Sequence, residues 1–190
     1  MADNYILCSQ PQVSGYIAGT VLLMILASAF GRMAPAAVLR YRKKENLLLI
    51  QLGKTVIYSA ALSLCVTALT AVWGCFNNQA AINWMNRNSF FYISTGYTVN
   101  VGLAYVMLHF FFGLFLCLLV LGLTFLIARW FFSSLLPALI MAAVILVADG
   151  IKLPFAFRCV EFQKCWFEYK LPFFQLIPII VRLGILLGVV

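Results

Sequence analysis

The chain has 190 residues, of which 65% are hydrophobic and only 9% are charged. Because a soluble domain carries about 25% charged residues, this composition predicts an integral membrane protein and excludes a water-soluble catalytic or nucleotide-binding module. The formal net charge of +8 is expected to set orientation in the membrane and to meet anionic lipid head groups. Nucleic acid is therefore not an expected partner.

Five stretches are apolar and long enough to predict membrane-spanning helices, since about 20 apolar residues cross a bilayer. We expect them at about residues 13–31, 55–75, 99–128, 130–148 and 171–190. The last is the weakest, because it is interrupted by Pro172, Gln175, Pro178 and Arg182. Long continuous apolar runs exclude a membrane barrel, whose strands alternate. The sequence therefore predicts an all-α polytopic membrane helix bundle in a single domain, with about five spans, four and six being the alternatives.

The most polar stretch follows the first span and carries Arg40, Arg42, Lys43 and Lys44, then Glu45. Loops rich in Lys and Arg stay in the cytoplasm, so the N-terminus is expected outside and the C-terminus inside. Residues 36–51 contain no Pro or Gly and follow Pro35, which suits the first position of a helix. A cytoplasmic helix is therefore predicted at 36–51, either lying on lipid or docked in a partner's groove.

Residues 150–170 form a predicted outer loop that is dense in aromatic side chains. Aromatic residues settle at the membrane interface, so this loop is expected to be an aromatic hairpin, re-entrant or interfacial, or an ordinary aromatic belt. Cys159 and Cys165 lie within it and are the candidate disulfide. Cys8 and Cys75 are predicted on the same outer side of the membrane, so other disulfide pairings stay open. The alternative that these cysteines are free thiols stays open too.

Catalytic chemistry is not predicted for this chain. His109 is the single histidine and has no neighbouring carboxylate, so it is expected to face another helix and not to hold a metal ion. Arg182 is expected to extend its long side chain so that the guanidinium lies at the cytoplasmic face, or to contact an anionic substrate. With five acidic residues in all, no enzyme activity, metal or cofactor bound by this chain is expected.

The order of the elements resembles the membrane subunit of bacterial type-2 ABC exporters. The resemblance rests on "RYRKKENLLLIQLGKTVIYSAALSL", a basic loop with one Glu that joins two spans, and on "FGLFLCLLVLGLTFLIARWFFSSLLPALIMAAVIL", a long span with a tight basic turn and its partner. An aromatic outer hairpin and a final span follow. The resemblance covers about residues 14–190 and is one of pattern. The family usually has six spans, whereas here one span precedes the basic loop, which implies a shortened variant.

The resemblance implies a transport mechanism in a bacterial cytoplasmic membrane. The basic loop would be a coupling helix seated on a separate cytoplasmic ATPase, through Arg40, Arg42, Lys43, Lys44 and Glu45. ATP bound by that partner would rock this chain and a second membrane subunit, identical or different, between inward and outward states. A peptide, lipid-like or drug-like substrate would pass between the two membrane subunits. The candidate path residues are His109, Gln175 and Arg182.

Two other functions stay open. A non-catalytic structural subunit of a multi-subunit membrane complex would explain the lack of chemistry and the short loops. A small-molecule-binding subunit of an uptake system would fit the size of the chain, although polar residues that converge within the spans are scarce.

Overall fold

The computed structural model describes residues 2–10, 12–30, 44–77, 82–96, 98–132 and 134–150, and the single positions 180, 181, 184, 185 and 188. Helices account for 87% of these described residues, and no strand occurs among them. The predicted all-α fold is therefore confirmed. The helical backbone also suits a membrane, because it satisfies its own hydrogen bonds where water is absent.

The first span is built from two kinds of helix. The short helix α1 (Ala2–Cys8) comes first, then the π-helix η1 (Gln12–Gly19), which passes directly into α2 (Thr20–Phe30). Together η1 and α2 form an apolar segment of 19 residues, long enough to cross a membrane. This segment coincides with the span predicted at 13–31.

The second span, α4 (Lys44–Asn77), is one unbroken helix of 34 residues. We expected a cytoplasmic helix at 36–51 and a separate span at 55–75, but the described part, from Lys44 onward, has no break between them. Gly53 does not interrupt the helix, because a helical glycine costs only about 1 kcal/mol relative to alanine. Thr55 reinforces this turn by donating its hydroxyl to the Gln51 carbonyl at 2.9 Å. Residues 36–43 lie outside the described residues.

The second half of the described chain holds three helices. The short helix α5 (Phe90–Thr95) is capped by Ser89, whose Oγ accepts from the Tyr92 amide, and ends at Gly96 with φ of 76°. The helix α6 (Leu103–Phe132) has 30 residues and α7 (Leu135–Gly150) has 16. α6 continues through Arg129, past the predicted end at residue 128, because an arginine is a good helix former and is favoured in a last turn.

Three described helical segments are long and apolar enough to cross a membrane: η1 with α2, the part of α4 from Asn46, and α6. α7 is a shorter apolar helix at the position of the fourth predicted span. The outer hairpin at 150–170 lies outside the described residues apart from Gly150. The fifth span at 171–190 does too, apart from the isolated positions named above.

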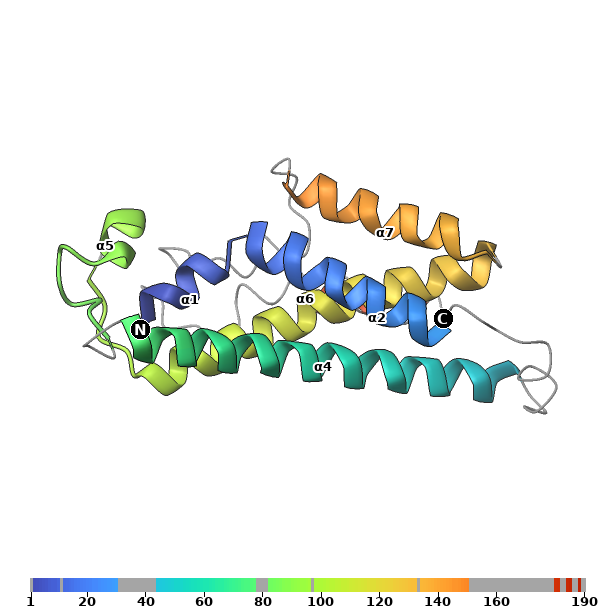
Figure 1. Cartoon of the computed structure of the whole chain (residues 1–190), viewed down its shortest axis with the longest axis horizontal. Coiled ribbons are helices and arrows are strands. Elements are labelled where there is room, and N and C mark those ends of the chain that lie inside the picture. The colour runs from blue at the N-terminus through green and yellow to red at the C-terminus, as the bar shows by residue number, and fades with distance from the viewer. Residues whose placement is uncertain are drawn as a thin grey trace.

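The long helices run alongside one another, with α6 in contact with α1, η1, α2, α4 and α7. Figure 1 shows the start of α4, the ends of α2 and α6 and the start of α7 at one end of the bundle. α1, α5 and the end of α4 lie at the other end. We call these the α6 C-terminal end and the α1 end. If the bundle crosses a membrane, the two ends face opposite leaflets.

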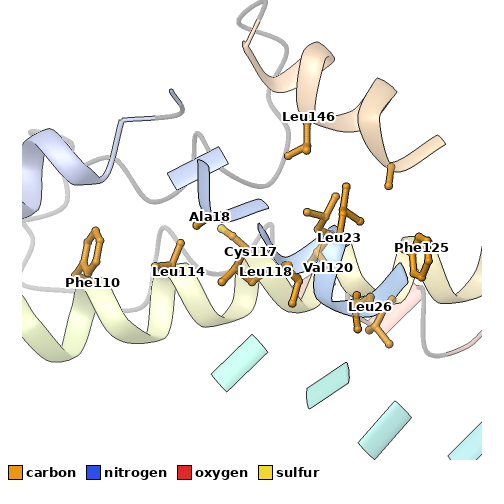
Figure 2. Close-up of a cluster of buried hydrophobic side chains, with 14 of the residues drawn as sticks. Ala18, Leu23, Leu26, Phe110, Leu114, Cys117, Leu118, Val120, Phe125 and Leu146 are labelled. Carbon is orange, nitrogen blue, oxygen red and sulfur yellow. The ribbon is translucent and has the colours of Figure 1, made fainter. Parts of the chain in front are cut away.

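The apolar core gathers on α6. Ala18 on η1, Leu23 and Leu26 on α2, and Leu146 on α7 point toward a row of α6 side chains (Figure 2) that includes Phe110, Leu114, Cys117, Leu118, Val120 and Phe125. Close packing of this kind associates helices in lipid, where no hydrophobic force drives them together.

The outer face of α4 is apolar and uncovered. Ile57, Leu64, Leu69 and Trp73 are each between 61% and 67% exposed. A continuous apolar surface of this kind is rare on a soluble monomer. It suits contact with lipid or with another membrane helix.

Candidate functional site

A column of buried polar side chains follows one face of α4. We call it the polar seam, and its members are Gln51, Thr55, Ser59, Ser63, Thr67 and Thr70. Successive members are three or four residues apart, a spacing that places them on one face of a helix. The seam therefore runs along most of the helix, on the side away from the exposed apolar face.

The seam packs against α6. Trp130 donates its indole N–H to the Gln51 Oε1 at 2.8 Å, and Ser63 donates its hydroxyl to the Phe111 carbonyl at 2.8 Å. Between these two contacts, a Cβ atom on Gly122 would lie 2.6 Å from the Thr55 Cγ2. The two backbones approach this closely because position 122 has no side chain.

Most hydroxyls of the seam are satisfied within α4 itself. Thr67 donates to the Ser63 carbonyl and Thr70 to the Val66 carbonyl, both at 2.8 Å. Ser59 differs, because its Oγ is buried and has no hydrogen-bond partner within the described part of the chain. The polar seam thus joins α4 to α6 through mostly small residues. The Ser59 hydroxyl is the seam hydroxyl that takes no part in a hydrogen bond within the described residues.

A second polar constellation fastens α1 at the α1 end of the bundle. The Asp3 carboxylate accepts from Asn83 Nδ2 and Trp84 Nε1, each at 2.8 Å, and from the Phe90 amide at 3.3 Å. Trp84 is fully buried and stacks on Phe91 with ring centroids 4.3 Å apart. One carboxylate therefore links α1 to the segment between α4 and α6.

Tyr5, two residues after Asp3 on α1, reinforces this attachment. Its hydroxyl donates to the Thr67 carbonyl at 3.2 Å, and its ring meets Phe110 edge-on at 5.2 Å. Burial raises the pKa of Tyr5 to about 12, with smaller contributions from the Cys8 and Cys75 thiols. Tyr5 therefore stays neutral and keeps its donor at physiological pH.

The predicted site residues do not converge. His109 is buried on α6, beside the Phe110 that meets Tyr5. Lys44 and Glu45 begin α4 at the opposite end of the bundle. The structure therefore separates His109 from Lys44 and Glu45, the described residues of the basic stretch. Outside the described residues lie Arg40, Arg42, Lys43, Cys159, Cys165, Gln175 and Arg182.

Within the described residues, no group of three or more His, Cys, Asp or Glu side chains could hold a metal ion. Cys8, Cys65, Cys75 and Cys117 form no disulfide with one another. What the described arrangement offers is polar contact between helices, with an exposed apolar face for lipid or a neighbouring subunit.

Sequence reasoning missed both constellations. The seam had a readable signal, because hydroxyl residues recur every three or four positions from Thr55 to Thr70. The bond between Asp3 and Trp84 had none, since it joins residues 81 positions apart.

Comparison with protein-family models, with curated proteins and with solved structures gives no match to this chain.

Proposed function

We propose that this chain is the membrane subunit of an ATP-driven exporter in a bacterial cytoplasmic membrane. A separate cytoplasmic ATPase would act on the basic loop, and a second membrane subunit would complete the path for a peptide, lipid-like or drug-like substrate. The N-terminus would lie outside, because the basic residues concentrate between the first two spans.

The observation that carries the proposal is the continuity of α4. The helix begins at Lys44, the last residue of the basic cluster, and runs without a break to Asn77. Force applied at Lys44 would act directly on a membrane span, since no loop interrupts the helix between Lys44 and Asn77. The contacts of Gln51 with Trp130 and of Ser63 with the Phe111 carbonyl would carry the movement to α6.

The polar seam suits such a movement. Small hydroxyl residues let helices pack closely, and each hydrogen bond between membrane helices contributes only about 0.6 kcal/mol on average. An interface of this kind rearranges at low cost, which is what switching between inward and outward states requires.

The test is co-purification from the native membrane in mild detergent. The wild-type chain should bring down a cytoplasmic protein that hydrolyses ATP. The double charge reversal R42E/K43E should abolish that association while the chain still inserts in the membrane. The single reversal R87E is the control, because Arg87 is exposed at the α1 end. A chain that purifies alone, or only with other membrane proteins, would contradict the proposal.

A second function, a structural subunit of a larger membrane complex, is favoured by the exposed apolar face of α4. Ile57, Leu64, Leu69 and Trp73 would then be covered by helices of neighbouring subunits. Co-purification with membrane proteins alone, unaffected by R42E/K43E, would select this function over the exporter.

A further inference from the structure

Arg129 is a buried cation near the C-terminal end of α6. Its side chain is only 7% exposed. Its Nε is shielded from solvent and has no hydrogen-bond partner within the described part of the chain. A buried donor without a partner is costly, and inside membrane proteins buried ionisable residues mark sites of function.

The neighbouring described groups do not supply the missing contact. Trp130, the next residue, donates its indole N–H to Gln51 Oε1, and Gln51 does not bond to the Arg129 Nε. Asp3 is the one acid whose side chain lies in the described part of the chain. It sits at the α1 end and is held by Asn83, Trp84 and Phe90. Among the side chains that the structure describes, no acid therefore lies at this end of the bundle to pair with Arg129, so the site is open to an anion from the membrane.

The surroundings of Arg129 indicate which anion. Phe131 is 76% exposed and Phe132 is 48% exposed, so the end of α6 presents apolar rings outward, as a span end in contact with lipid would. α7 begins at Leu135, six residues further on, and the free N–H groups of a helix start attract phosphate. α4 begins at Lys44, the last residue of the basic cluster, at the same end of the bundle.

We propose that Arg129 binds the phosphate of an anionic glycerophospholipid in the leaflet at the α6 C-terminal end. A planar guanidinium matches the oxygens of a phosphate with two parallel hydrogen bonds. The lipid phosphate would reach the guanidinium from the level of the head groups, and the first turn of α7 would add its N–H groups. This lipid site does not depend on the exporter proposal, because any membrane subunit with this bundle would have it.

The experiment compares wild type, R129Q, R129K and R87Q in nanodiscs and in neutral detergent. Native mass spectrometry measures retained lipid, and thermal unfolding measures protection by phosphatidylglycerol, by phosphatidylcholine and by inorganic phosphate. Wild type should retain phosphatidylglycerol and be protected by it more than by phosphatidylcholine. R129Q should weaken that binding about tenfold, the loss expected for a charge-assisted hydrogen bond. R129K should retain part of the binding, and R87Q should match wild type.

Three results would overturn the proposal. In the first, R129Q retains phosphatidylglycerol as wild type does. In the second, both lipids protect wild type equally. In the third, inorganic phosphate protects as well as phosphatidylglycerol, which would assign Arg129 to a soluble phosphate compound. If R129Q does not fold, the lipid preference of wild type and its partial loss in R129K decide the question.

Discussion

Two serines on the polar seam are alike in position and differ in one hydrogen bond. Ser59 and Ser63 are both fully buried on the same face of α4, one turn apart. Ser63 donates to the Phe111 carbonyl on α6, whereas Ser59 Oγ has no partner in the described part of the chain. The contribution of the Ser63 hydroxyl to the free energy of unfolding can therefore be measured, with Ser59 as the matched control.

Replacing Ser63 with Ala should lower the free energy of unfolding by about 0.6 kcal/mol, the average for a hydrogen bond between membrane helices. Replacing Ser59 with Ala should leave it unchanged or raise it slightly, because a buried polar atom without a partner is removed. Reversible unfolding of both variants in detergent measures the difference. Equal losses in the two variants would mean that Ser59 has a partner the structure does not show.

At the scale of helices, Gly122 on α6 lies in a tight contact with α4. The missing side chain at Gly122 leaves room for Thr55, whose Cγ2 would lie 2.6 Å from any Cβ placed there. At Gly53, which lies on α4 two residues before Thr55, an added Cβ atom would have no other atom within 4 Å. The same substitution should thus have opposite effects at the two positions.

Replacing Gly122 with Ala should destabilise the bundle by about 1–3 kcal/mol, the usual cost of overpacking a tight interface. Replacing Gly53 with Ala should stabilise it by about 1 kcal/mol, because alanine favours the helix. Adding T55S to G122A removes the clashing methyl group and should restore part of the loss. Thermal unfolding of the four proteins tests this, and a double variant no better than G122A would contradict the assigned clash.

The attachment of α1 is a second element-scale feature that can be tested. Replacing Asp3 with Asn turns one acceptor oxygen into a donor facing other donors. The change should loosen α1, since a hydrogen bond to a charged group is worth about 1.5–3 kcal/mol. Maleimide labelling of the half-buried Cys8 should become several-fold faster. N86A is the control, because the Asn86 side chain bonds only to the Asn88 amide in its own loop. Unchanged labelling in D3N would show that α1 is held by its apolar contacts alone.

At the scale of the whole molecule, the predicted orientation places the α1 end outside. A thiol reagent that cannot cross membranes should label Cys8 in intact cells, in a variant whose other cysteines are Ser. It should not label a cysteine introduced at Asn46, near the start of α4, until the cells are permeabilised. The reverse pattern would show that the basic loop lies outside.

The sequence predicted the parts of this fold that depend on local composition. Apolar runs of about the length that a bilayer needs, or more, predicted helices at 13–31, 55–75 and 99–128, and the structure has long apolar helices at each. The helix ends were less predictable, because Gly53 and Arg129 look like boundaries in the sequence but are tolerated inside a continuous helix. Contacts of Asp3 and Trp84 could not be predicted, since nothing local to either residue encodes a partner 81 positions away.

The unequal lengths of the helices bear on the shape of the membrane around them. The apolar part of α4 has 32 residues, or about 48 Å at 1.5 Å per residue, against a hydrocarbon thickness of about 30 Å. α7 has 16 residues, or about 24 Å by the same measure. A bilayer would have to thicken, or α4 to tilt, on one side of the molecule, and to thin on the other. A thicker membrane would therefore fit the α4 side better and the α7 side worse, and a thinner membrane would do the reverse.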